Sequence, residues 1–126
     1  MAITPVETLV KAAKAEITTL PRDAVQAQVA DGTAVLVDIR DIRELERAGR
    51  IPGAIHAPRG MLEFWADPAS PYHREDFATD KRMILFCAGA WRSALAAKTL
   101  QDMGFDNVAE MAGGFSKWAE DGLPTA

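Results

Sequence analysis

The sequence predicts an α/β fold in which helices cover both faces of a parallel β-sheet. Segments with strand character alternate with segments of helical periodicity along the chain, which is the pattern of repeated β–α units. Two strand segments, 34–39 and 82–86, are apolar almost throughout, as expected for strands buried on both faces. A chain of 126 residues, of which 48% are hydrophobic, suits one domain with a single core.

The first half of the chain is predicted to alternate between helices and strands. Thr4 is the expected cap of a short N-terminal helix, Pro5 is its first residue, and Glu7 completes a capping box. Asp41 and Glu44 form the same kind of box at the start of a later helix. Apolar spacing and turn residues place the elements after the first helix in this order: strand 17–20, helix 21–30, strand 34–39, helix 41–49 and strand 54–57.

The second half continues the alternation after a polar interruption. Residues 61–65 are expected to form one or two helical turns, and 67–81, rich in proline, serine and charge, a long loop with a little helix. The remaining elements are expected in this order: strand 82–86, helix 92–103, strand 107–111 and helix 115–120. Gly104 and Gly122 mark the ends of the two helices.

Composition excludes several classes of function. A net charge of −4 argues against nucleic-acid binding, which usually requires a basic patch. The amino end lacks a long apolar stretch, so we expect neither a signal peptide nor a membrane anchor. A single cysteine forms no internal disulfide and favours a reducing compartment, the cytoplasm. One cysteine and two histidines without ligand spacing predict no metal site, and no cofactor is expected.

The single cysteine, Cys87, follows the second apolar strand directly. Free cysteines are often buried and inert, so the simplest interpretation of an isolated one is a small core residue. However, ligands of parallel α/β sheets bind outside the carboxyl ends of the strands, and Cys87 stands at such an end. The sequence after it therefore decides between an inert thiol and a nucleophile.

That sequence favours a nucleophile. Small side chains allow the backbone to wrap closely around the sulfur, and the helix that follows carries partial positive charge at its amino end. Arg92 adds a permanent cation, and such surroundings lower the pKa of a thiol from about 8.5. We therefore expect Cys87 to be catalytic and an anion-binding loop to follow it, made of Ala88, Gly89, Ala90, Trp91, Arg92 and Ser93.

Four further residues have both a structural and a functional interpretation. Asp38 ends a buried strand and is expected to brace neighbouring loops, through an arginine for example, rather than to catalyse. Arg59 either adds positive potential near the site or is a solvated loop residue. His56 and His73 could approach Cys87, but a Cys–His dyad is not expected, because lone histidines are more often structural.

Three segments, in order, resemble the rhodanese-like domain family of sulfurtransferases: "VLVDIRDIRELERAGRIPGAIHAP", "ILFCAGAWRSALAAKTLQDMGF" and "VAEMAGGFSKWAEDGLP". The resemblance runs from about residue 16 to Pro124 and implies a sheet of five parallel strands. It also divides the chain into an N-terminal helical extension, 1–15, and a rhodanese-like domain, 16–126.

The resemblance implies that Cys87 attacks the outer sulfur of a donor, thiosulfate or an organic or protein persulfide, and passes it from a Cys87 persulfide to a thiol. Family sulfurtransferases have four residues between cysteine and arginine, as here, whereas phosphatase-like relatives have five. Members that serve only as interaction or regulatory modules usually lack the cysteine. There are three alternatives to a sulfurtransferase: that non-enzymatic role, a relative of phosphatases or arsenate reductases, and a redox sensor.

This sequence departs from the family pattern at positions that bear on which sulfur donor the protein uses. Many members have glycine where this chain has Ala90, and thiosulfate-specific members often carry basic residues where Ala88 and Gly89 stand. Trp91 would form an apolar lip that favours an organic thiol or a partner protein over a small dianion. Arg50 replaces a histidine that is frequent before Ile-Pro-Gly. The sequence leaves the donor, the acceptor and the oligomeric state open.

Overall fold

Five parallel strands form one sheet in the computed structural model, which describes residues 2–126. The strand order is β1-β5-β4-β2-β3, and every neighbouring pair is parallel. This confirms the α/β fold with a five-stranded parallel sheet. The strands are β1 (Thr18–Leu20), β2 (Ala34–Asp38), β3 (Ile55–His56), β4 (Arg82–Phe86) and β5 (Val108–Met111).

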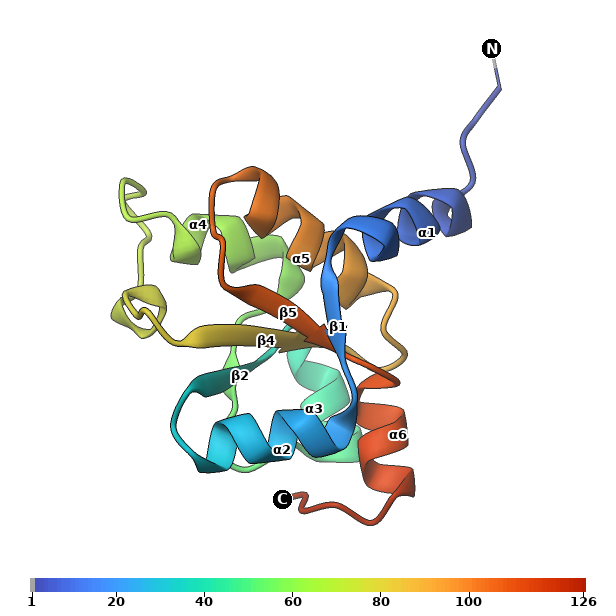
Figure 1. Cartoon of the computed structure of the whole chain (residues 1–126), viewed down its shortest axis with the longest axis vertical. Helices are drawn as coiled ribbons and strands as arrows, with labels where there is room; N and C mark the ends of the chain where they lie inside the picture. The colour runs from blue at the N-terminus through green and yellow to red at the C-terminus, as the bar shows by residue number, and fades with distance from the viewer. Residues whose placement is uncertain (1) are drawn as a thin grey trace.

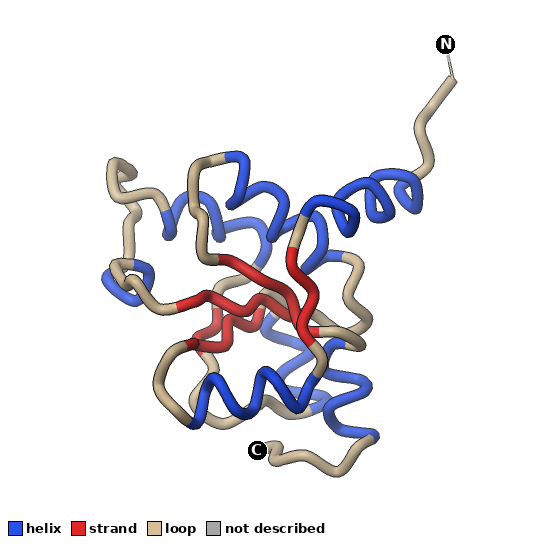
Figure 2. Tube along the Cα trace, viewed as in Figure 1, coloured by secondary structure: helices blue, strands red, loops and turns tan. Residues whose placement is uncertain are grey.

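Six α-helices cover the two faces of the sheet. Figure 1 shows one layer above the sheet and one below it, and Figure 2 shows the strands between the two. One layer contains α1 (Val6–Glu16), α4 (Leu62–Ala66) and α5 (Arg92–Asp102). The other contains α2 (Arg22–Ala30), α3 (Ile42–Ala48) and α6 (Gly114–Glu120).

The central strand β4 separates two apolar cores. Met83 and Leu85 face the layer of α4 and α5, and Ile84 and Phe86 face the layer of α2 and α6. Successive side chains of a strand point to opposite faces, so a strand between two helical layers is apolar at most positions on both faces. Cys87 continues the first of these faces and is part of the core under α5.

The amino end of α1 differs from the sequence prediction. Pro5 is the cap of the helix in an extended conformation, and no side chain caps it. Thr4 and Glu7 therefore do not form the predicted capping box. The reason is a shift of one residue: the carbonyl of Pro5 accepts the first hydrogen bonds of the helix, so Thr4 lies outside it.

Helix α3 begins as predicted. The Asp41 side chain accepts a hydrogen bond from the backbone of Arg43, and the Glu44 side chain accepts one from the backbone of Asp41. Both halves of the capping box are thus present. This box fixes the position of Glu44, which lies in the first turn of α3, between that helix and the cysteine loop.

Other elements differ from prediction mainly at their ends. The strand expected at 54–57 has only two residues, and the turns expected at 61–65 are the end of a 3₁₀ turn, Arg59–Met61, followed by α4. The long loop 67–81 contains one 3₁₀ turn, Glu75–Phe77. No helix in the described part of the chain is long and apolar enough to span a membrane.

Helix α1 packs on α5. Val10 and Ala13 of α1 are buried and form a small apolar cluster with Ala94 of α5. The helix ends at Glu16, close to the boundary expected between an extension, 1–15, and a domain, 16–126; that division stays a prediction. In the last turn of α1, Lys14 Nζ lies 2.7 Å from Glu110 of β5, the neighbour of β4, after which the cysteine comes.

Candidate active site

Cys87 lies directly after β4, at the edge of the sheet where the carboxyl ends of the parallel strands meet. The residue is 1% exposed and lies beneath the loop that follows it. Burial alone fits an inert core thiol as well as a nucleophile. The groups that surround the sulfur therefore distinguish an inert thiol from a nucleophile.

Backbone N–H groups of the loop point at the sulfur. The N–H groups of Ala90 and Ser93 donate to Cys87 Sγ at 3.2 and 3.4 Å. Ala90 has a φ of 69°, in the left-handed region that favours glycine, and it stands where the resemblance expects glycine. The loop thus turns at Ala90 and offers two backbone hydrogen-bond donors to an anionic sulfur.

Helix α6 holds the other side of the loop. The backbone N–H groups of Phe115 and Ser116 donate to the carbonyls of Cys87 and Ala88 at 2.8 and 3.1 Å. A Cβ at Gly114 would lie 2.5 Å from both carbonyl oxygens, so only glycine permits this approach. Because the loop carbonyls point outward to α6, its N–H groups are free to point toward the sulfur.

Arg92 is held by a carboxylate from α3. Its Nη1 and Nη2 donate to the Glu44 oxygens at 2.8 and 3.0 Å. This hydrogen bonding raises the pKa of Arg92, with the nearby Cys87 sulfur as a smaller contributor, and lowers the pKa of Glu44. The sequence assigned Glu44 to the capping box alone and missed its pairing with Arg92, since nothing local signals a contact across 48 positions.

A second polar chain leads away from the sulfur toward β5. The thiol donates to Ser93 Oγ at 3.6 Å, and Ser93 Oγ donates to Glu110 Oε1 at 2.7 Å. The other carboxylate oxygen accepts from Lys14 Nζ at 2.7 Å and Thr19 Oγ1 at 2.9 Å. Sequence reasoning missed these partners. The available signal was an acidic residue inside the apolar strand β5, because a buried carboxylate requires donors.

Asp38 forms a buried ion pair with Arg40. Arg40 donates to both Asp38 oxygens, at 2.8 to 3.2 Å, and also to the carbonyl of Gly49 at 2.9 Å. Its guanidinium lies 4.1 Å from the ring centre of Phe115, at the start of α6. Both charged residues are buried, and the pair links the end of β2 to the loop after α3 and to α6.

The other candidate side chains have partners of their own. Arg59 donates to Glu63 at 2.6 Å and to Thr99 at 3.4 Å, which joins α4 to α5. The rings of His56 and His73 each lie within hydrogen-bond distance of a backbone carbonyl oxygen. These contacts do not bring Arg59 or either histidine to the sulfur. Across residues 2–126, no group of three or more potential ligand side chains is arranged to hold a metal ion.

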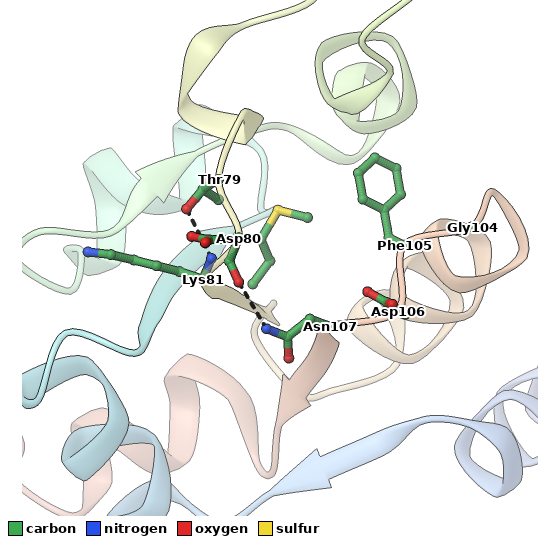
Figure 3. Close-up of a pocket in the computed structure, with 8 residues that line it drawn as sticks. Thr79, Asp80, Lys81, Gly104, Phe105, Asp106 and Asn107 are labelled. Carbon is green, nitrogen blue, oxygen red and sulfur yellow. Dashed lines mark hydrogen bonds between the residues drawn. The ribbon is translucent and has the colours of Figure 1, made fainter.

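Trp91 is half exposed beside the cysteine, at the start of α5. A separate hollow of about 300 Å³ lies at the opposite edge of the sheet, near the amino ends of β4 and β5 (Figure 3). In it Asn107 donates to the backbone carbonyl of Asp80 at 3.2 Å. Its residues are Thr79, Asp80, Lys81, Met83, Gly104, Phe105, Asp106 and Asn107.

Comparison with known sequences gives matches over most of the chain. The sequence model of the rhodanese-like domain family matches residues 21–121. A sulfurtransferase from Allochromatium vinosum is 30% identical over 90 residues, which are 71% of this chain and 76% of that protein. The matched part is 60% of a relative from Bacillus subtilis and 20% of one from Candida albicans, so those relatives are longer than the match.

Several solved structures are similar over nearly the whole chain, and two of them are at least 33% identical to it. A protein of unknown function from Rhodopseudomonas palustris, described as a possible tyrosine phosphatase, is 44% identical with a TM-score of 0.94, and the match covers 100% of this chain and 97% of that one. The polysulfide-sulfur transferase homodimer from Wolinella succinogenes is 33% identical with a TM-score of 0.76, and the match covers 95% of this chain and 85% of that one.

Proposed function

This chain belongs to the rhodanese-like domain family, and we propose that it is a sulfurtransferase in which Cys87 carries the transferred sulfur as a persulfide. The observation that carries the proposal is the cradle around the sulfur. Two backbone N–H groups donate to Cys87 Sγ at the carboxyl edge of the sheet, and α6 holds the loop in that conformation. An inert core thiol has no need of such donors.

The reaction has two half-reactions. The Cys87 thiolate attacks the outer sulfur of the donor; a new S–S bond forms, and the bond to the rest of the donor breaks, with its electron pair leaving on the donor. An acceptor thiolate then attacks the outer sulfur of the persulfide and releases the Cys87 thiolate. The N–H groups of Ala90 and Ser93 stabilise the negative charge on sulfur in both steps. This order of events gives ping-pong kinetics.

We assign the donor to organic or protein persulfides rather than to thiosulfate. Ala88 and Gly89 place no cation beside the sulfur, and the Arg92 guanidinium is already engaged by Glu44. Trp91 offers an apolar surface beside the loop, which suits a thiol-bearing molecule or a partner protein better than a small dianion. The names of similar proteins include a polysulfide-sulfur transferase and a putative sulfur carrier protein, which suit such a donor, and also a thiosulfate sulfurtransferase, so the donor assignment rests on the loop residues. The acceptor is a thiol, and the reaction belongs to a reducing compartment such as the cytoplasm.

A phosphatase is the second candidate, because the similar structure from Rhodopseudomonas palustris is described as a possible tyrosine phosphatase. Two features favour sulfur. Only four residues separate Cys87 from Arg92. Moreover, both terminal nitrogens of Arg92 are bound to Glu44, whereas a phosphatase needs the arginine to hold phosphate oxygens.

Intact-mass measurement tests the proposal. We expect the protein to gain one sulfur atom from glutathione persulfide, to lose it to added thiol, and to do neither as Cys87→Ser. Sulfur uptake that survives Cys87→Ser would overturn the role of Cys87. Hydrolysis of an aryl phosphate that depends on Cys87, without sulfur uptake, would favour the phosphatase. If neither reaction occurs with the wild-type protein, the non-enzymatic interaction module is the remaining interpretation.

Comparing donors tests the part assigned to Trp91. We expect faster loading from glutathione persulfide than from thiosulfate, and a loss of this preference as Trp91→Ala. Phe64→Ala is the matched control, because Phe64 is an equally exposed aromatic residue of α4, outside the loop. A preference for thiosulfate in the wild-type protein would show that the assigned donor class is wrong.

A further inference from the structure

A carboxylate buried behind the catalytic sulfur has no part in the reaction described above. Glu110 of β5 is 0% exposed. Its oxygens accept hydrogen bonds from Ser93, Thr19 and Lys14, at 2.7, 2.9 and 2.7 Å. All three partners are hydrogen-bond donors, which suits a group that only accepts. A buried negative charge of this kind requires a cation, and Lys14 supplies it.

Lys14 comes from a part of the chain outside the family match. It lies in the last turn of α1, and the match begins at residue 21. Thr19, the second donor to the same carboxylate oxygen, also precedes that match. Helix α1 is docked on α5 by Val10 and Ala13, which fixes the direction from which Lys14 reaches Glu110.

Only one hydroxyl group separates this charge pair from the sulfur. Ser93 Oγ donates its hydrogen to Glu110, so a lone pair of the hydroxyl is left facing Cys87 Sγ at 3.6 Å. A negative charge at Glu110 opposes a second negative charge on the sulfur. The Lys14 ammonium group offsets this electrostatic repulsion. It contacts the carboxylate oxygen that Ser93 does not contact.

The remaining charged groups near Cys87 are paired with each other. Arg92 of α5 approaches the sulfur and is bound to Glu44 of α3. At the end of β2, which pairs with β4, Asp38 is bound to Arg40. Loss of Lys14 would leave Glu110 as a carboxylate without a cation in these surroundings.

We propose that α1 completes the sulfur site: Lys14 is a positioning residue that neutralises Glu110, so that Cys87 can carry negative charge as a thiolate and as a persulfide. The inference rests on the proposed function, because it concerns the charge of the same sulfur. It adds a helix that the family match does not include. Lys14 acts through Glu110 and Ser93 and does not touch the donor.

The ultraviolet absorbance of the thiolate is the measurement that tests this charge pair. The chain has one cysteine, so subtracting the titration of Cys87→Ser, which removes the contribution of Tyr72, leaves the absorbance change of Cys87, and no reagent has to enter the site. We expect Lys14→Met to raise the titration midpoint by about one pH unit, which means about tenfold less thiolate at a fixed pH below the midpoint. Lys14→Arg should restore the wild-type midpoint.

Lys11→Met is the matched control, because Lys11 lies on the same helix and pairs only with exposed Glu7. Glu110→Gln should lower the midpoint, since it removes the negative charge and keeps Lys14. The double variant, Lys14→Met with Glu110→Gln, should return close to the wild-type value. Thermal unfolding followed by circular dichroism identifies any variant that does not fold. If Lys14→Met does not fold, the direction of the midpoint shift in Glu110→Gln still tests the inference.

An unchanged midpoint in both Lys14→Met and Glu110→Gln would overturn the inference. It would also fail if Lys11→Met shifted the midpoint as far as Lys14→Met. Its failure is distinguishable from failure of the proposed function. Persulfide formation with unmoved midpoints refutes only the role of Lys14, whereas moved midpoints in a protein that never gains sulfur refute only the sulfurtransferase.

Discussion

Arg92 and Glu44 face each other, and the two terminal nitrogens of the guanidinium donate to the two oxygens of the carboxylate at 2.8 and 3.0 Å. The pair connects the first residue of α5 with the capping box of α3. It therefore joins the end of the cysteine loop to the segment that follows β2. A bidentate pair of this geometry fixes orientation as well as distance, so it constrains where the loop ends.

Acid should weaken this connection. The hydrogen bonds from Arg92 hold the pKa of Glu44 below its ordinary value of 4.5. A carboxyl group whose pKa is lower in the folded state stabilises the fold above its unfolded pKa, and this contribution is lost as the pH falls through the folded value. We predict that Glu44→Gln is less stable than the wild type near neutral pH and that the difference shrinks below about pH 4.5.

Chemical denaturation at several pH values measures this difference. Glu46→Gln is the matched control, because Glu46 is an exposed glutamate of the same helix. Its difference from the wild type should change little with pH in the same range. A Glu44→Gln deficit that stays constant down to pH 3 or so would show that the lowered pKa of Glu44 does not contribute to stability.

The approach of α6 to the cysteine loop depends on Gly114. Its Cβ would lie 2.5 Å from the carbonyl oxygens of Cys87 and Ala88, and its φ is 60°. Gly122 has a similar φ of 74° with nothing near its Cβ position. We predict that Gly114→Ala costs several kcal/mol of unfolding free energy and most of the persulfide formation, whereas Gly122→Ala costs about 1 kcal/mol and leaves persulfide formation intact. Equal losses in the two variants would refute the steric explanation.

The sequence predicted the sheet and the position of Cys87 because both follow from local patterns. A strand buried on both faces is apolar almost throughout, and β4 is apolar and buried from Met83 to Phe86, so its end and the cysteine after it could be identified. The capping box of α3 is a pattern of four residues and was identified in the same way. The box expected at Thr4 was wrong because a shift of one residue costs little at an exposed helix end.

The partners of the site residues could not be predicted, because they lie far apart in the chain. Glu110 and Lys14 are separated by 96 positions and come together only in the folded structure, where α1 packs on α5 and β5 lies in the sheet. A glutamate inside an apolar strand signals that some donor must exist, but not which one. The roles of the loop residues, of Asp38 and of Arg59 stay predictions.

The buried pair of Asp38 and Arg40 should matter for stability. Both side chains are at most 2% exposed, so removing one charge leaves the other buried without a partner. We predict that Asp38→Asn costs about 3–5 kcal/mol of unfolding free energy. Glu7→Gln, which breaks the exposed pair with Lys11, should cost well under about 1 kcal/mol. Urea denaturation measures both values. A small loss in Asp38→Asn would mean that Arg40 finds other acceptors.

The backbone strain in the cysteine loop can be tested by removing one methyl group, that of Ala90. Its φ of 69° is unfavourable for an alanine, and the strain is of the order of 1 kcal/mol. Glycine removes that strain but gains freedom in the unfolded chain, which costs about 0.5–1 kcal/mol at ordinary positions. We therefore predict that Ala90→Gly leaves the unfolding free energy unchanged or slightly higher, with persulfide formation retained.

Ala119→Gly provides the comparison, because Ala119 is exposed within the regular helix α6 and has no strain to release. It should lose about 1 kcal/mol, the usual difference between alanine and glycine inside a helix. The unfolded-state term is common to both variants, so their difference reports the strain at Ala90 less the contribution of its methyl group, which is buried. If Ala90→Gly lost as much stability as Ala119→Gly, the strain of the left-handed backbone at Ala90 would be no larger than the contribution of its buried methyl group.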